Sequence, residues 1–600
     1  MTSDHDLRAR ARALGVETSY WDVTGQYHEA SDETLRAIVD VLAADEQVTA
    51  GIEPVVVGRP ADVAVGATGT AELELDDGTL VHLTPVAGRA ALPPDLPIGC
   101  HRVRMGESDV AVIVPPTAMP RDPELAGSAG LFVPAYALWE EGSPLPSFAH
   151  LEAFTAAAAR VSAAFVATLP LYAAFLDDPF DPSPYAPESR LHWNEVYIDD
   201  AALPPAPLAA QGDIIDWADL AARRRHQLLE ASRDLEPYLQ AGIDALVATR
   251  PDVADHARFR AARPTAADAG APEALVVRSH LLAQLLAERQ LGRVESTGGA
   301  QLALDLPIGS HPAGYERWAH GELFAAGMTV GAPPDEFFGD GQDWGFPPQL
   351  PSAGRRSGHE LWRRLVAAAG RHASILRVDH VMGVHRLWWI PEGMGAQQGA
   401  YVRYPHDEIL GVIAAEAWRT ATTIIGENLG TVPAEVTEAL AHWRVLGMYE
   451  EQFALYHSDA LPSIPADSVA GIRTHDMPAF AAAFDGDATG EQYDYRRLVE
   501  AAVGHPVGDD PADVLDAALE RLAASEAYAT VVDVDDLIGE IAPHNVPGRV
   551  LPSTWRRRLP RPASAVLGDL DVRRRVKLLT TRTRRGQSFA RSAHTPEGSS

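Results

Sequence analysis

Three predicted strands each end in an acidic residue within a polar, turn-forming context. Asp379 follows Ile-Leu-Arg-Val, Glu427 follows Ile-Ile-Gly, and Asp476 follows Ile-Arg-Thr-His. They lie about 48 residues apart, which is one strand–helix–strand step or a little more. Catalytic groups of an α/β barrel stand at the carboxyl ends of its strands, so we expect these three carboxylates to meet at one mouth.

Carboxylates around one cleft suit the chemistry of a glycosidic bond. That bond breaks through an oxocarbenium-like transition state, which needs one carboxylic acid to protonate the leaving oxygen and one carboxylate facing the anomeric carbon. When the two groups are close, the carboxylate attacks and forms a covalent glycosyl-enzyme, and the configuration is retained. A third acid can bind sugar hydroxyls and raise the pKa of the proton donor by like-charge repulsion.

Basic side chains adjoin these acids. Arg377 lies on the same strand face as Asp379, where its guanidinium would keep that carboxylate ionised at neutral pH. His380 and His475 could donate hydrogen bonds to sugar hydroxyls. A simpler interpretation also exists, since a strand-end Asp is commonly a helix N-cap and Asp–His pairs are common structural contacts. A metal site is not predicted, because these residues include no His-x-x-x-His or similar ligand pair.

The elements that must position these residues alternate between strand and helix over more than 400 residues. This alternation predicts an α/β fold, a (β/α)8 TIM barrel with insertions. The strand candidates are Ala163–Leu171, Ala300–Ile308, Ala373–Val381, Thr422–Gly430, Leu446–Leu455 and Asp467–Asp476.

Two smaller regions precede the barrel. The apolar spacing in residues 1–52 indicates helices, and the short alternating runs after them predict a β-sandwich. That β-domain could bind a ligand, mediate dimerisation or only brace the barrel. The basic end of the chain is either a solvated helix with a frayed end or a patch for an acidic partner. The predicted domains are 1–52 (helical), 53–117 (β-sandwich), 118–560 (catalytic barrel with inserted subdomains) and 561–600 (basic tail).

The charge balance excludes some classes of partner. Lys and Arg total 50 against 83 Asp and Glu, a formal net charge of −33. Nucleic-acid binding and docking on anionic lipid both need clustered basic residues, so neither is predicted. The balance fits an enzyme acting on a neutral or cationic ligand, although solubility alone also explains it.

Cysteine usage and the chain start point to the cytoplasm. Cys100 is the only cysteine, which excludes an internal disulfide and a cysteine-based zinc site. The first residues contain no apolar signal region, and Arg160 and Pro170 interrupt the longest apolar stretch. We therefore expect a cytoplasmic protein without a membrane span; the oligomeric state is not predicted.

Motifs in one order along the chain resemble glycoside hydrolase family 77, the 4-α-glucanotransferases known as amylomaltases or disproportionating enzymes. The resemblance covers about residues 130–560. The motifs are SPYAPESR (183–190), NEVYID (194–199), DLPIG (305–309), VGAPPDEF (330–337), GQDWG (341–345), RVDHVMG (377–383), LWWIP (387–391), IIGENLGTVP (424–433), RTHDMP (473–478) and NVPG (545–548).

The resemblance implies a role for each matching residue. Asp379 would be the nucleophile, Glu427 the general acid/base and Asp476 the stabiliser of the transition state. The implied substrate-binding residues are Arg377, His380, His475, Tyr185, Ser183, Asp335, Gln342, Trp344 and Asn545. No metal or organic cofactor is implied, and the partners would be maltodextrins and other α-1,4-glucans.

The resemblance also implies transfer of glucan segments to the 4-hydroxyl of an acceptor sugar. Transfer exceeds hydrolysis only if the loop at 331–345 shields the intermediate from water. The aromatic rings of that loop alternate with polar residues, a pattern that suits sugars but also occurs in purely structural lids. Two alternatives remain, an amylase-like glucan hydrolase and a catalytically silent glucan-binding protein.

Overall fold

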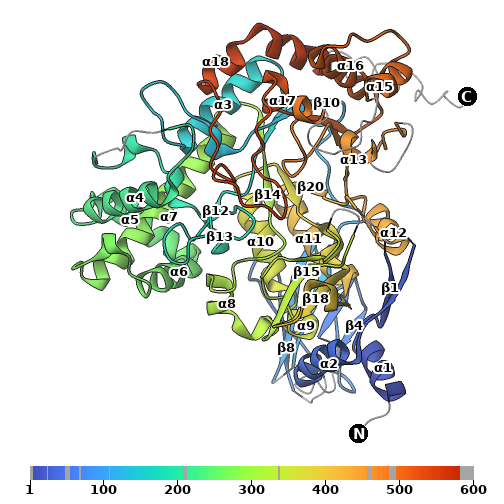
Figure 1. Ribbon diagram of the computed structural model, residues 1–600. Helices are drawn as coiled ribbons and strands as arrows, with labels where there is room; N and C mark the ends of the chain where they lie inside the picture. Colours follow the sequence, from blue (N-terminus) through green and yellow to red (C-terminus); the bar gives the residue numbers. More distant parts are fainter. Residues whose placement is uncertain are drawn as a thin grey trace, which may run out of the picture.

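The computed structural model describes most of the chain. It covers residues 4–22, 25–46, 54–65, 69–106, 108–206, 212–335, 338–430, 432–455, 461–484 and 495–580. Figure 1 shows the N-terminal region at one end of the molecule and the C-terminal helices at the other, with the barrel between them.

The centre of the molecule is a parallel barrel in which consecutive strands are neighbours. The strands are short and most of their residues are buried, which is typical of a sheet covered by helices. The ring closes between β20 and β21, where the Gly426 N–H donates to the Leu446 carbonyl at 2.8 Å. The barrel strands are β10 (Ser128–Phe132), β11 (Phe165–Ala167), β14 (Gln301–Leu306), β17 (Ile375–Val378), β20 (Thr423–Gly426), β21 (Gly447–Glu450), β22 (Ser468–Gly471) and β23 (Ala529–Asp533). The predicted fold class is confirmed.

Helices on the outside cover the barrel, as the apolar faces of their sequences require. None of the helices in the ranges given above is long and apolar enough to cross a membrane. The helices around and above the barrel are α3 (Phe148–Arg160), α10 (Glu360–Gly370), α11 (His406–Thr420), α12 (Ala434–Trp443), α13 (Glu451–Leu455), α14 (Phe480–Phe484), α15 (Tyr495–Val503), α16 (Pro511–Ala524), α17 (Val534–Ile538) and α18 (Ala563–Gly568).

Two substructures, built from segments inserted between barrel strands, extend the barrel. The first lies between β11 and β14 and forms a helical lobe, seen on the left of Figure 1. It comprises β12 (Tyr172–Ala173), β13 (Ser189–Trp193), α4 (Trp217–Ala231), α5 (Pro237–Thr249), α6 (Pro251–Ala261) and α7 (Glu273–Ser296). The second consists of two segments, one between β14 and β17 with α8 (Tyr315–Ala319) and α9 (Pro351–Arg356) and one between β17 and β20, which together form an antiparallel sheet in the order β16–β15–β18–β19. The strands of this sheet are β15 (Met328–Ala332), β16 (Gln342–Asp343), β18 (Arg386–Pro391) and β19 (Ala400–Arg403).

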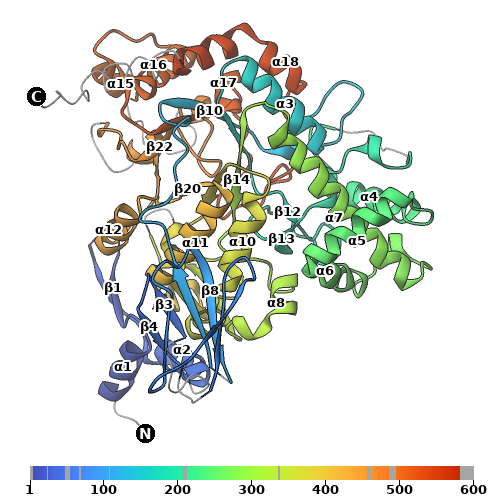
Figure 2. The ribbon, with the colours of Figure 1, turned by 180° about the vertical axis from the view of Figure 1, so that it is seen from behind.

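The N-terminal region contains helices, a hairpin and two facing sheets. Buried Leu73, Val103 and Val112 belong to the core of the sheets, and Ile113 packs with Val412 of α11. Figure 2 shows these strands below the barrel. The elements are α1 (Asp4–Ala13), β1 (Ser19–Trp21), β2 (Tyr27–Glu29), α2 (Asp32–Glu46), then the sheet of β3 (Val55–Val57), β9 (Ser108–Val114), β8 (Gly99–Met105), β5 (Ala71–Glu74) and β6 (Leu80–Leu83), and the pair β4 (Asp62–Ala64) and β7 (Arg89–Ala91).

The basic segment after residue 560 packs on the barrel over its described part. Residues 570–580 are helical, and Val572 and Val576 are buried. The Arg575 guanidinium donates to the Leu537 carbonyl at 2.7 Å. Residues 581–600 lie outside the described ranges.

A buried ion cluster beneath the barrel mouth leads to a prediction about stability. The Arg473 guanidinium lies 2.9 Å from Asp533 and 2.8 Å from Asp536, with all three side chains at most 3% exposed. Arg473→Ala would leave both carboxylates unpaired in the interior, and we expect it to lower the free energy of unfolding by about 3–5 kcal/mol. Denaturant unfolding measures this loss. Arg233→Ala, which breaks an exposed pair with Glu230, should cost under about 1 kcal/mol.

Candidate active site

The ends of β17 and β20 bring two of the three predicted acids together. The Asp379 N–H donates to the Leu306 carbonyl at 3.0 Å, and the Glu427 N–H donates to the Val378 carbonyl at 3.0 Å. The parallel ladder therefore continues one residue beyond each strand. Both carboxylates stand at the same edge of the barrel, on adjacent strands.

Arg377 links Asp379 to a carboxylate that the sequence analysis did not select. Its Nη1 lies 2.6 and 2.8 Å from the two carboxylate oxygens of Asp305, and 3.1 Å from Oδ1 of Asp379. Asp305 is the direct register partner of Arg377 on β14. The Tyr185 hydroxyl donates to Asp305 Oδ2 at 2.5 Å. Tyr185 is thereby tied into the same cluster.

Backbone N–H groups hold the Glu427 carboxylate. Its Oε2 accepts from the His380 N–H at 2.9 Å, and its Oε1 accepts from the Leu429 N–H at 2.7 Å. His380, whose N–H makes the first of these bonds, has a left-handed backbone (φ +44°). Glu427 is consequently fixed in one orientation beside the neighbouring strand end.

Asp476 is the most exposed of the three acids, with 46% of its side chain accessible. Its Oδ1 accepts from Asn545 Nδ2 at 2.7 Å, and its Oδ2 lies 3.3 Å from His475 Nε2. The His475 ring stacks on Tyr185 with centroids 5.0 Å apart and an interplanar angle of 9°. Trp555 packs on both of these rings, at 5.8 and 6.0 Å. Asn545 and the stacked His475 therefore hold Asp476 at the rim of the cluster.

Burial controls the pKa values of the two inner acids. It raises the pKa of Asp379 above its ordinary value of 3.8, with Arg377 opposing the shift and Glu427 adding to it. The pKa of Glu427 is also raised by burial, which outweighs Arg377 and the two backbone N–H groups, and Asp305 adds to the rise. The net shift of Asp379 is therefore upward, although Arg377 favours its ionised form as the sequence analysis expected. Burial lowers the pKa of His380 and of His475, which favours their neutral forms.

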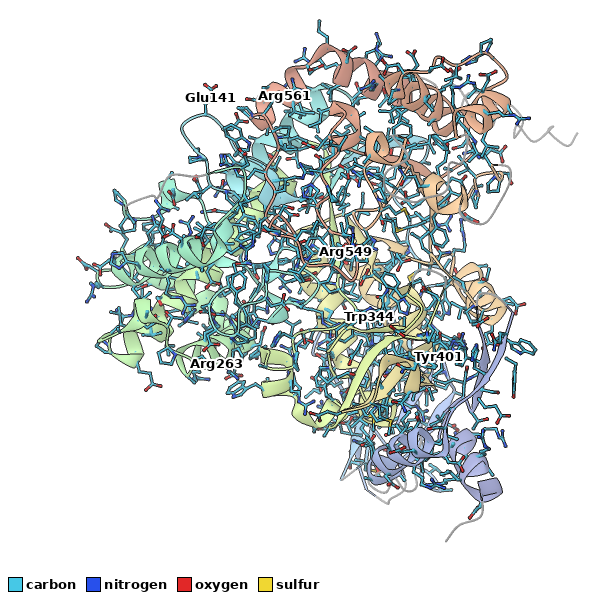
Figure 3. The ribbon with its side chains drawn as sticks, in the orientation of Figure 1. Glu141, Arg263, Trp344, Tyr401, Arg549 and Arg561 are labelled. Atoms are coloured by element: carbon cyan, nitrogen blue, oxygen red, sulfur yellow. The ribbon has the colours of Figure 1, made fainter. Side chains whose placement is uncertain are left out.

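Of the predicted loop residues, Trp344 contacts the cluster. Its ring packs edge-on against His380, with centroids 5.2 Å apart, and its Nε1 donates to Gln342 Oε1 at 2.8 Å. Asp335 accepts from the Phe338 N–H at 2.6 Å, and Ser183 accepts from the Tyr185 N–H at 3.3 Å. These two side chains therefore shape their own loops. Figure 3 labels Trp344 and Arg549 near the centre of the view. Glu336 and Phe337 of the family-like motif lie outside the described residues.

Three residues near the cluster escaped the sequence analysis. Asp305 could have been found as a strand-end acid inside the DLPIG motif. Trp555 carries no local signal, because it reaches the site from a distant loop. Glu450 lies in a cavity of about 80 Å³ that Asp305 and Arg377 also line, and burial raises its pKa to about 8.

The arrangement can supply a proton donor and a nucleophile on adjacent strands. Glu427 is partly buried and its pKa is raised, which suits a general acid. Arg377 holds one oxygen of Asp379, and the other oxygen can face a reacting carbon. Within the ranges that the structure describes, no group of three or more His, Cys, Asp or Glu side chains is arranged to hold a metal ion.

Known proteins resemble this chain in sequence and in fold. Residues 133–564 match the family model of glycoside hydrolase family 77, described as 4-α-glucanotransferase. The 4-α-glucanotransferase of Mycobacterium tuberculosis (strain ATCC 25618 / H37Rv) is 30% identical over 584 residues, with 80% of this chain and 80% of that protein covered. That of Haemophilus influenzae is 25% identical over 564 residues, again with 80% of each chain covered.

Two solved amylomaltases share the fold. The amylomaltase of Corynebacterium glutamicum superposes with a TM-score of 0.83 at 22% identity, covering 96% of this chain and 99% of the other. The amylomaltase of Streptococcus agalactiae, solved in complex with acarbose, has a TM-score of 0.65 at 21% identity and covers 76% and 99%. The first similarity includes the N-terminal region as well as the barrel.

Proposed function

The chain belongs to glycoside hydrolase family 77, the 4-α-glucanotransferases, and we propose that it moves α-1,4-glucan segments from a donor maltodextrin to the 4-hydroxyl of an acceptor sugar. The observation that carries the proposal is the pair Asp379 and Glu427 on adjacent barrel strands, inside the region that matches the family. The barrel mouth also offers ring stacks and fixed polar groups, which suit a neutral sugar polymer.

In the first half-reaction, the Asp379 carboxylate attacks the anomeric carbon of the donor. The bond between that carbon and the glycosidic oxygen breaks, and Glu427 gives its proton to the leaving oxygen. The product is a glycosyl ester on Asp379 and a released segment with a free 4-hydroxyl. Asp476, held by Asn545 at 2.7 Å, would bind hydroxyls of the sugar that reacts.

In the second half-reaction, the ionised Glu427 takes the proton of the acceptor 4-hydroxyl. The acceptor oxygen attacks the anomeric carbon, the ester bond breaks, and Asp379 leaves as a carboxylate. Two inversions give net retention, so the new bond is again α-1,4. Trp344, packed on His380, would lie where a loop can limit the access of water to the intermediate.

Incubation with maltotriose tests this function. Chromatography of the products should show glucose together with a ladder of longer maltodextrins. Glucose and maltose alone would indicate the hydrolase alternative. An unchanged substrate would indicate the catalytically silent glucan-binding protein.

The pH dependence follows from the two raised pKa values. Asp379 must be ionised to attack, so kcat/KM should fall as the pH drops through a pKa above its ordinary 3.8. Glu427 must be protonated, so kcat/KM should fall as the pH rises through a pKa above its ordinary 4.5. We expect a bell-shaped profile of initial rates. Its two apparent pKa values describe the coupled Asp379–Glu427 pair, not either residue alone. A rate that keeps increasing with pH would contradict the acid role of Glu427.

A further inference from the structure

Two exposed aromatic rings on the N-terminal hairpin lie outside the site described so far. We propose that Trp21 and Tyr27 form a remote binding platform for long α-glucan chains, attached to the same sheet as the loop beside the active site. This inference rests on the proposed function, because it names a further contact for the same polymer.

The two rings face solvent although they are large and apolar. Trp21 is 65% exposed and Tyr27 is 49% exposed. They are direct register partners on β1 and β2, with ring centroids 5.2 Å apart and an interplanar angle of 59°. Rings that stay in water contribute little to folding. The CH faces of a sugar pack on such rings, and two rings at an angle can follow a curved glucan chain.

The underside of the hairpin packs against β18 and β19. Tyr20 packs edge-on against Trp388 at 5.0 Å and against Tyr401 at 5.9 Å. Its other neighbour is the His28 ring, stacked at 5.1 Å, and His28 Nε2 lies 2.7 Å from Asp22 Oδ2. A platform held in this way loses little conformational entropy when a ligand binds.

The hairpin joins the sheet that carries the active-site loop. Glu17, two residues before β1, binds Arg386 of β18 at 2.6 Å and Arg403 of β19 at 2.8 Å. Its N–H also donates to the Tyr401 carbonyl at 2.8 Å. Figure 3 labels Tyr401 and Trp344 on neighbouring parts of this region. The two edge strands of this four-stranded sheet are β16, which lies next to Trp344, and β19, which lies next to the hairpin.

The width of that sheet sets the reach that the ligand needs. Three strand spacings separate β16 from β19, which is roughly 15 Å. A long glucan that occupies the active site could extend over this distance. A maltotriose molecule bound in the active site would not contact the platform. Attachment at two sites on one polymer raises the apparent affinity without any new contact at the reacting bond.

The size and charge of the surface favour a neutral sugar over a protein. The exposed parts of the two rings offer roughly 200–300 Å², well below the roughly 800 Å² per partner of a stable protein interface. Asp22 and Glu29 flank the rings, and the chain has a formal net charge of −33, so an anionic ligand is disfavoured.

The double variant Trp21→Ala/Tyr27→Ala tests the platform. With long amylose as donor and acceptor, KM should rise about tenfold, while kcat/KM with maltotriose stays within about twofold of the wild type. Trp418→Ala is the matched control, because Trp418 is 52% exposed on α11 and belongs to no cluster named above. It should leave both substrates unchanged. Trp21→Phe/Tyr27→Phe, which keeps two rings, should retain most of the affinity for amylose.

Affinity electrophoresis in gels that contain amylose gives a readout without turnover. The wild type should be retarded, and the double alanine variant should migrate faster than Trp418→Ala. This result can hold even if maltotriose shows no transfer, so failure of the proposed function is distinguishable from failure of the platform. Equal retardation of the double variant and the wild type, or a change in oligomeric state in place of a change in retardation, would overturn the inference.

Discussion

Asp379→Asn is expected to lower the rate of glucan transfer by about 10⁴-fold or more, while glucan binding persists. Asparagine has almost the same shape as aspartate but cannot form the glycosyl ester. The amide oxygen can still accept from Arg377, which lies 3.1 Å from Oδ1 in the native site. Arg377 also keeps its two contacts with Asp305, so the cluster should stay folded.

Initial rates with maltotriose measure the loss, and calorimetric titration with a maltodextrin measures binding. Asp571→Asn is the matched control, since the Asp571 side chain is 75% exposed and makes none of the active-site contacts described above. It should keep the wild-type rate. If Asp379→Asn retains more than about a tenth of the activity, Asp379 is not the nucleophile.

Most of the barrel was predictable because its strands carry strong local signals. The six strand candidates of the sequence analysis all lie on barrel strands. The first and eighth strands, β10 and β23, were not selected. β10 contains Ser, Ala and Gly, and β23 runs directly into α17 with Asp533 as its cap, so neither stands out as an apolar run between turns. Parallel pairing across the whole chain stabilises them, and local sequence does not reveal such pairing.

The site was predictable at the strand ends and less so elsewhere. Asp379 and Glu427 follow apolar strands, so their convergence could be inferred from spacing alone. Asp305 depends on register, because it contacts Arg377 only when β14 and β17 pair residue 305 with residue 377. Trp555 depends on a loop that returns from the end of the barrel. The functional roles of the site residues remain predictions, which the variants described here test.

Glu427→Ala is the second change with a large expected effect, a loss of about 10²–10⁴-fold in transfer from maltodextrin donors. The leaving sugar oxygen then departs without a proton. Glutamine would change more than the proton donor, because both carboxylate oxygens of Glu427 accept hydrogen bonds from backbone N–H groups, at 2.9 and 2.7 Å. An amide NH2 group would face one of these donors and disturb the loop. Alanine instead leaves space beside the anomeric carbon.

Two substrates make this prediction specific to the acid/base. α-Glucosyl fluoride has a leaving group that needs no protonation, so its first step should proceed in Glu427→Ala at close to the wild-type rate. Azide can then enter the vacated space and attack the glycosyl ester on Asp379, releasing a glycosyl azide of retained α-configuration and restoring turnover. Glu438→Ala, at an exposed position of α12, is the control. Neither the change of donor to the fluoride nor the addition of azide should alter its rate relative to the wild type. If azide fails to restore turnover and the fluoride is as poor a donor as maltodextrin, Glu427 does not act as the acid/base.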